Sequence, residues 1–178
     1  MTLPFYTIGH SNRTLRDFFA LLDEAGIRAL VDIRKIPKSR SNPQYNENTL
    51  EDDLAALDIT YEHVAALGGL RGKTSALPRT VNGFWTNESF HNYADYALSG
   101  DFHAGLDYLI DVGRRRRCVM MCSEAVWWRC HRRIVADYLL ARGETVLHIM
   151  GHGHLEPASL TVGAVVQSDG TVAYPAEA

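Results

Sequence analysis

The feature that most constrains this chain is the alternation of short apolar runs with amphipathic helical segments. We predict five strands in "FYTIG", "RALVDIR", "TYEHV", "CVMMC" and "TVLHIM". Between them, residues 14–26, 49–58, 89–116 and 129–143 show helical periodicity. Continuous apolar runs are typical of strands that are buried on both faces of a parallel sheet. We therefore predict a three-layer, Rossmann-like α/β domain with a mostly parallel sheet, forming a single domain over residues 1–178.

Local signals set the expected boundaries of these elements. Thr14 and Asp17 are typical of a helix start, and Asn48 is expected to cap the second helix. Ser99-Gly100 predicts a break in the third helical region, and the Gly-rich segment 65–85 is interpreted as a functional loop. The segment "VGAVVQSDGTVAYP" predicts a C-terminal β-hairpin.

Composition excludes some partners. The chain has 178 residues and a formal net charge of −3, so its surface as a whole does not favour polyanions. No apolar stretch is long enough to cross a membrane, and "MTLPFYTIGH" lacks the pattern of a signal peptide. Three cysteines without a secretory signal predict reduced thiols and a cytoplasmic location.

Side chains that can act as nucleophiles, acids, bases or hydrogen-bonding groups lie at the carboxyl ends of the predicted strands. Parallel sheets bind ligands in the crevice beyond these ends. The side chains placed there are His10 and Ser11, Asp32 to Arg34, His63, Cys122 to Glu124, and His148. We expect His10, Arg34, Glu124 and His148 to lie around one cleft on one side of the sheet.

The stretch "CVMMCSEAVWWRCHRR" holds all three cysteines. Cys122 ends the fourth strand, and Cys130 precedes the next helix, where the helix dipole and nearby Arg and His favour a thiolate. Both are candidate nucleophiles, with Glu124 as a general acid or base and Arg129 or Arg132 as an anion holder. Cys118 is expected to be a core residue, and simple packing of the other two cysteines remains the alternative.

Two more specific interpretations of this stretch are less favoured. A phosphate-cradling loop needs glycines, and "CSEAVWWR" has none. A zinc site could use Cys122, Cys130 and His131 with a histidine of "HIMGHGH", but the chain has no C-x-x-C pair. Neither a cofactor nor a bound metal is part of the leading hypothesis, and a metal-binding protein is kept as an alternative.

Basic residues favour an anionic ligand. Arg34, Lys35, Lys38 and Arg40 follow the second strand beside Asn42 and Tyr45; Arg71, Lys73 and Arg79 share the long loop with Trp85. Cations interleaved with aromatics suit stacking on bases and contact with phosphates. A solvated loop is the alternative interpretation. The run Arg114 to Arg117 is expected to lie on a capped, solvated helix end or to widen a basic patch.

The chain resembles domain-of-unknown-function family 488 over nearly its whole length. The resemblance rests on "TIGHSNRTLRDFFALLDEAGI", "LVDIRKIPKSRSNPQYN", "YEHVAALGG", "VLHI" and the Cys-x-Glu … Cys-His-Arg pattern. It implies a compact α/β fold and assigns no activity. The family's motif residues fall here on His10, Ser11, Arg34, Arg40, Asn42, Pro43, Gly68, Gly69, Cys122, Glu124, Cys130, His131, Arg132 and His148. The segment "AVWW" departs from the family pattern, which has small or acidic residues and a proline there.

These observations lead to one main hypothesis and two alternatives. The main hypothesis is an enzyme that acts on an anionic substrate resembling a nucleotide or nucleic acid. Its expected catalytic residues are Cys122, Glu124, Cys130, His131 and His10. Its expected substrate-binding residues are Ser11, Arg34, Arg40, Asn42, Arg71, Arg132 and His148. The alternatives are a non-catalytic nucleic-acid-binding module and a protein that binds metal through cysteine and histidine.

Overall fold

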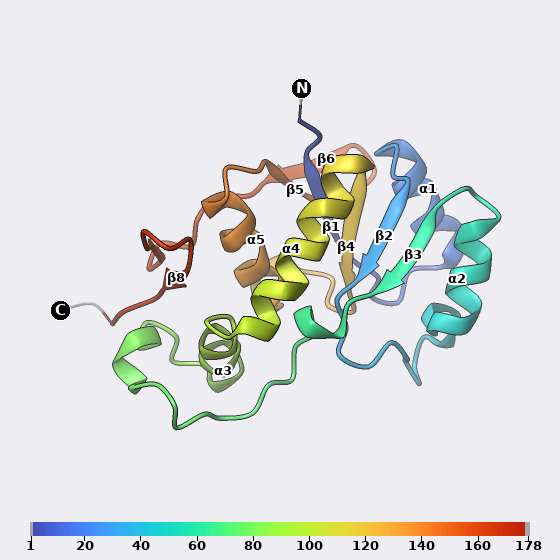
Figure 1. Ribbon diagram of the computed structural model, residues 1–178. Coiled ribbons are helices and arrows are strands. Elements are labelled where there is room, and N and C mark those ends of the chain that lie inside the picture. Colours follow the sequence, from blue (N-terminus) through green and yellow to red (C-terminus); the bar gives the residue numbers. More distant parts are fainter. Residues whose placement is uncertain (1, 177–178) are drawn as a thin grey trace.

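A computed structural model of the protein describes residues 2–176 and contains one large mixed sheet (Figure 1). Its six strands lie in the order β3-β2-β4-β1-β5-β6, and only β6 runs antiparallel to its neighbour. The strands are β1 (Phe5–Gly9), β2 (Ala29–Asp32), β3 (Thr60–His63), β4 (Cys118–Cys122), β5 (Val146–Gly151) and β6 (His154–Pro157). The predicted α/β class and mostly parallel sheet are confirmed, whereas β6 was not predicted.

Helices cover both faces of the sheet. The α-helices are α1 (Leu15–Glu24), α2 (Glu47–Ala55), α3 (Glu88–Tyr96), α4 (Gly100–Arg115) and α5 (Arg132–Ala141). Short 3-10 turns are η1 (Pro43–Tyr45), η2 (Ala65–Leu67), η3 (Arg79–Asn82) and η4 (Trp127–Arg129). The helices α1 and α2 pack on one face, and α3, α4 and α5 pack on the other (Figure 1).

The sheet's alternating side chains explain the two cores. In β4, Cys118, Met120 and Cys122 point toward the α3–α5 layer, whereas Val119 and Met121 point toward α1 and α2. Because every residue of β4 is buried, apolar side chains are required on both faces. This continuous apolar run is the pattern from which the strand was predicted.

The cleft at the carboxyl edge follows from the connections. The chain leaves β2 toward α2 on one face, and it leaves the neighbouring β4 toward α5 on the other. The two loops therefore diverge and leave a crevice beyond the strand ends. The arrows of β2 and β4 end at this edge, at the bottom of Figure 1.

Helix boundaries mostly match the sequence signals. Thr14 caps α1 by accepting a hydrogen bond from the Asp17 backbone N–H at 3.2 Å, as predicted. Ser99 caps α4 and separates it from α3. The expected Asn48 cap of α2 is wrong, because the helix begins at Glu47 and Asn46 is the flanking residue. The Oδ1 of Asn46 instead accepts from the Ser39 backbone N–H at 2.8 Å, which folds the preceding loop.

The C-terminal segment forms the predicted hairpin from β7 (Val165–Val166) and β8 (Val172–Ala173). Tyr174, which follows β8, is fully buried beside α5. None of the described helices combines the length and apolar character that a membrane crossing would need.

Candidate active site

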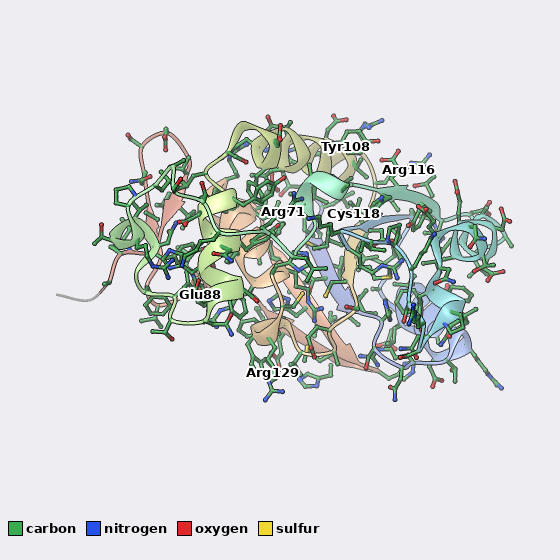
Figure 2. The ribbon with its side chains drawn as sticks, turned by 90° about the horizontal axis from the view of Figure 1, so that it is seen from below. Arg71, Glu88, Tyr108, Arg116, Cys118 and Arg129 are labelled. Carbon is green, nitrogen blue, oxygen red and sulfur yellow. The ribbon has the colours of Figure 1, made fainter. Side chains whose placement is uncertain are left out.

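A cavity of about 530 Å³ opens at the carboxyl edge of the sheet. Four segments line it: the loop after β2, the loop after η2, helix α3, and the segment from the end of β4 to the start of α5. Predicted site residues in its wall are Arg34, Cys122, Glu124, Cys130 and His131. Figure 2 views the molecule from this edge, with Arg129 projecting outward into solvent.

Close packing between β1 and β4 fixes the loop that carries Glu124. The backbone N–H of His10 donates to the Cys122 carbonyl at 2.9 Å, and that of Ser11 donates to the Ser123 carbonyl at 3.0 Å. A Cβ at Gly9 would lie 1.7 Å from the Glu124 carbonyl oxygen. Glycine at position 9 is therefore required for the loop to approach β1.

Cys122 and Cys130 form a direct sulfur pair at the floor of the cavity. Their Sγ atoms lie 2.8 Å apart. The Nη1 of Arg132 lies 2.6 Å from the Cys122 Sγ, and its backbone N–H donates to the Cys130 Sγ at 3.4 Å. Arg132 is completely buried and also donates to the carbonyls of Glu124 and Ala125. Arg132 thus contacts both sulfurs: its guanidinium holds Cys122 and the loop between the cysteines, and its backbone N–H holds Cys130.

The two sulfurs differ in acidity. Burial raises the pKa of Cys122 well above its usual value, and the hydrogen bond that it shares with Cys130 adds to this effect. Burial opposes a thiolate at Cys130 as well, but the hydrogen bond from Cys122 and the charge of Arg132 outweigh it and lower the pKa of Cys130. Of the two candidate nucleophiles, Cys130 is therefore the one whose environment favours the thiolate.

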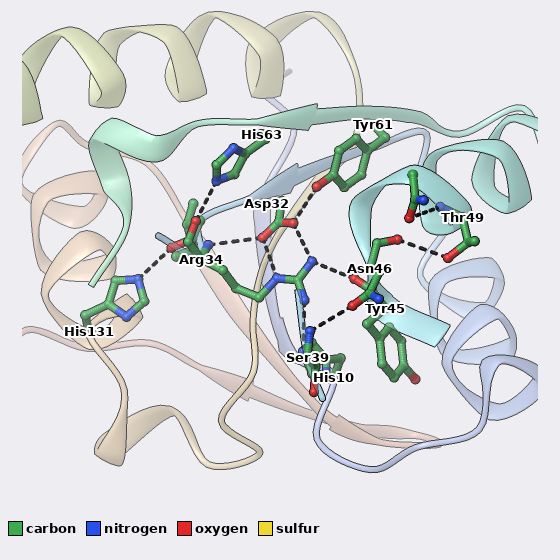
Figure 3. A network of polar contacts seen from close by, with 12 residues as sticks. His10, Asp32, Arg34, Ser39, Tyr45, Asn46, Thr49, Tyr61, His63 and His131 are labelled. Carbon is green, nitrogen blue, oxygen red and sulfur yellow. Dashed lines mark hydrogen bonds and ion pairs between the residues drawn. The ribbon is translucent and has the colours of Figure 1, made fainter. Parts of the chain in front are cut away.

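His131 is oriented with its Nδ1 toward the sulfur pair. Its Nε2 lies 2.9 Å from the Ile33 carbonyl, which can only accept, so Nε2 carries the ring proton (Figure 3). Burial lowers the pKa of His131, so the ring is neutral at pH 7 and its Nδ1 is a free acceptor, 3.5 Å from the Cys130 Sγ. Gly69 lets the neighbouring loop pack against this ring, because a Cβ there would come within 3.0 Å of Nδ1. A thiol beside an oriented, neutral imidazole is a nucleophile–base arrangement.

Arg34 reaches the cavity wall, but its guanidinium is occupied by protein groups (Figure 3). Its Nε and Nη2 bind the two carboxylate oxygens of Asp32 at 2.9 and 2.7 Å, and Nη2 also donates to the Tyr45 carbonyl at 2.7 Å. Nη1 lies 3.4 Å from the Nε2 of His10. Four of the five N–H donors are therefore used, which leaves Arg34 too few free donors to grip a ligand anion through two hydrogen bonds. Desolvation opposes the charge on Arg34, but the bonds with Asp32 outweigh it and raise its pKa.

His10 and His148, expected around the cleft, are not in the cavity wall. The Nδ1 of His10 is hydrogen-bonded to the Ser11 carbonyl at 2.8 Å, and its ring stacks on Tyr45. His148 lies within β5 opposite Thr7, not at the strand end, and stacks on Trp127 with centroids 4.8 Å apart. Burial lowers the pKa of each histidine to about 4, so both rings are neutral supports for the residues around the cavity.

The remaining predicted binding residues lie outside the cavity wall. Ser11 adopts a left-handed backbone with φ 49°, which turns the chain after β1. Arg71 donates to the Gly68 and Ala65 carbonyls and lies over the Tyr96 ring at 3.8 Å, so it holds the loop after η2. The other residues in this group are Arg40, Asn42 and Arg132.

Helix α3, which forms one wall of the cavity, carries no signal in the sequence that marks it as part of a site. Ser89, Phe90 and Tyr93 of α3 line the cavity, and the Tyr93 hydroxyl donates to the Leu67 carbonyl at 2.7 Å. Their spacing is that of an ordinary amphipathic helix, so nothing in the sequence distinguishes them from core residues. Trp85, which the sequence groups with the cations of the long loop, is buried and stacks on Phe90.

The cysteines and histidines of the described chain do not assemble into a metal centre. Within residues 2–176, no group of three or more His, Cys, Asp and Glu side chains is arranged to hold a metal ion. Cys118 is fully buried in β4, and burial raises its pKa to about 12, as expected for a core thiol.

The fold and this site define an α/β protein with a thiol pair at the floor of a cleft at the sheet's carboxyl edge. The chain belongs to the family described as "Domain of unknown function DUF488", which it matches over residues 14–139. The predicted family is thereby confirmed, and the matched region contains the sulfur pair, Arg34 and the cavity-lining part of α3. Comparison with curated proteins and with solved structures found no match.

Proposed function

We propose that this protein is an enzyme that uses the Cys130 thiolate as a nucleophile on an anionic substrate about the size of a mononucleotide. The observation that carries the proposal is the Cys122–Cys130–Arg132 cluster at the floor of a cavity whose rim bears cations. A buried cation beside two sulfurs favours the thiolate form, and the thiolate is the nucleophilic form of cysteine.

Each neighbouring group has a role in this scheme. When the pair is fully protonated, the Nδ1 of His131 accepts the proton of Cys130, and the Cys122 thiol then stabilises the resulting thiolate by donating to it. The Cys130 sulfur donates its electron pair to an electrophilic centre of the substrate. The bond between that centre and its leaving group breaks, and the proton held by His131 passes to the leaving group. Glu124, exposed on the rim, is placed to exchange protons with the departing group.

The charge of the rim supports an anionic ligand. Lys38 and Arg129 line the cavity, are exposed, and form no ion pair with the described residues. Lys35 adds a third cation, held by the Leu70 carbonyl at 3.2 Å. Only one carboxylate, Glu124, lies among them. Phe90 and Tyr93 supply an aromatic wall, which suits a ligand with a planar part beside its charge.

The arginine run at the opposite edge does not widen this site. Arg114 pairs with Glu144 at 2.8 Å and Arg115 pairs with Asp111 at 2.7 Å. Arg117 donates to the Ala25 carbonyl and the Tyr6 hydroxyl. These contacts support a small anionic ligand over a long nucleic acid that would cover both edges.

The test is the rate at which iodoacetamide alkylates Cys130 in the reduced protein, followed by peptide mass spectrometry from pH 5 to 10. A lowered pKa places the thiolate at lower pH, so labelling of Cys130 should begin to rise below the ordinary value of about 8.5. A mononucleotide at low salt should slow this labelling, and Lys38→Gln with Arg129→Gln should remove the protection. Cys118 should stay unlabelled and serves as the internal control.

Matched variants separate the roles. His131→Gln keeps a donor toward Ile33 but removes the acceptor at Nδ1, so labelling of Cys130 at pH 7 should slow. Cys122→Ala should slow it too, whereas Cys122→Ser, which keeps a donor to the thiolate, should preserve it. Labelling only above pH 8.5 would refute the nucleophile. Nucleotide binding without such a thiol would favour the non-catalytic module, and no protection at low salt would refute the nucleotide-sized anion.

A further inference from the structure

We propose that Cys122 and Cys130 form a redox-active dithiol that closes to an intramolecular disulfide, with Cys130 as the attacked sulfur and Cys122 as the resolving one. The Sγ atoms are already in contact at 2.8 Å, and both thiols are free. A disulfide needs about 2.05 Å, so a sulfur displacement of under 1 Å closes the bond. Both sulfurs line the cavity, which gives a small oxidant access to them.

The chemistry balances with a hydroperoxide as the oxidant. The Cys130 thiolate attacks the terminal peroxide oxygen, an S–O bond forms, and the O–O bond breaks to release hydroxide or alkoxide. Cys122 then loses its proton and attacks the Cys130 sulfur of the sulfenic acid, which expels hydroxide as the S–S bond forms. The two sulfurs lose two electrons in total, the peroxide gains them, and the thiol protons end in water or alcohol.

Arg132 fits both steps. Its backbone N–H contacts the Cys130 sulfur, which is the thiolate of the first step. Its Nη1 contacts the Cys122 sulfur and stabilises the charge that appears there when Cys122 deprotonates in the second step. The guanidinium is anchored by two backbone carbonyls of the same loop, so it stays in place while the sulfurs react.

The third cysteine provides an internal comparison. Cys118 lies four residues before Cys122 in β4, about 13 Å along the strand. It is fully buried at the far end of the sheet and has no sulfur partner among the described residues. Disulfide formation should therefore be confined to the Cys122–Cys130 pair.

Closure of the disulfide would remove the nucleophile of the proposed enzyme and so switch the site off. This regulatory consequence depends on the proposed function, whereas disulfide formation itself does not.

The experiment treats reduced protein with hydrogen peroxide near one equivalent and follows intact mass and iodoacetamide labelling. Wild type and Cys118→Ser should lose the mass of two hydrogen atoms, lose labelling at Cys130, and recover both with dithiothreitol. Cys122→Ser should stop at a Cys130 sulfenic acid that dimedone traps. Cys130→Ser should show neither product at Cys122 on the same timescale.

Other products would overturn the inference. These are wild-type protein that only gains oxygen, covalent dimers, or a disulfide that contains Cys118. Disulfide formation is measured without ligand, and ligand protection is measured on reduced protein. The two assays are therefore independent: a negative result for disulfide formation does not affect the interpretation of ligand protection, or the reverse.

Discussion

At the scale of single residues, His10 and His148 show how burial can turn a predicted reactive group into a neutral support. Both side chains are almost fully inaccessible, and both ring orientations are set by hydrogen bonds. An imidazolium in either place would lose its hydration without gaining a carboxylate contact, since His10 faces the cation of Arg34 and His148 lies near Arg132.

We expect the free energy of unfolding to fall as the pH drops from 6.5 to about 4. The folded protein holds both histidines neutral down to about pH 4, whereas the unfolded chain takes up protons at about 6.5. The unfolded state binds more protons in this window, so acid favours it, by up to ~1.4 kcal/mol per pH unit for each histidine.

Urea unfolding of wild type, His10→Gln and His148→Gln at a series of pH values measures this effect. Each variant should show a shallower slope than wild type between pH 4 and 6.5. Equal slopes in all three proteins would show that these histidines titrate normally in the folded state.

At the scale of secondary-structure elements, the buried ion pair of Asp32 and Arg34 joins the end of β2 to the loop that follows it. The Asp32 carboxylate also accepts from the Tyr61 hydroxyl of β3, and Arg34 reaches the Tyr45 carbonyl of η1. These contacts shape one wall of the cavity and occupy most of the Arg34 guanidinium, so they favour a positioning role for Arg34 over direct ligand binding.

Arg34→Met should therefore act first on folding. It leaves the buried carboxylate of Asp32 without its cation, which costs about 3–5 kcal/mol. Arg34→Lys keeps the charge but cannot contact Asp32, Tyr45 and His10 together, so it should also destabilise. Chemical denaturation checks both, with Arg40→Lys as the exposed control. If Arg34→Met leaves the stability unchanged, the ion pair with Asp32 does not support the fold, and Arg34 is again a candidate for direct ligand binding.

At the scale of the whole molecule, the C-terminal segment ties together elements distant in the sequence. The Tyr174 hydroxyl donates to Asp137 of α5 at 2.7 Å, and its backbone N–H donates to the Asn82 side chain at 3.0 Å. Its carbonyl accepts from the Phe84 N–H. This network supports the layer that contains α3 and hence the aromatic wall of the cavity.

Tyr174→Phe should lower the free energy of unfolding by about 1–3 kcal/mol, because the buried Asp137 loses a hydrogen-bond donor. Tyr108→Phe removes a hydroxyl contact with Glu62 from an exposed tyrosine and should change stability little. Thermal unfolding of both variants measures the two losses of stability. Equal losses would show that the Tyr174–Asp137 hydrogen bond contributes no more than an exposed contact.

Local patterns in the sequence were enough to predict the α-helices, the five parallel strands and the edge where the cleft lies, but not the antiparallel strand β6. These patterns are apolar runs buried on both faces, helical periodicity, and caps such as Thr14. Cys122, Cys130 and His131 could be placed at the site because each lies directly at a strand end or a helix start.

Packing between distant segments settled which of these groups meet and in which protonation state. That Cys130 and not Cys122 is the acidic thiol depends on Arg132 and on the contact between the two sulfurs. That Arg34 is paired depends on Asp32, Tyr45 and His10 converging from three segments. Desolvation and hydrogen-bond geometry arise between residues far apart in the chain, and no local pattern of residue types specifies them.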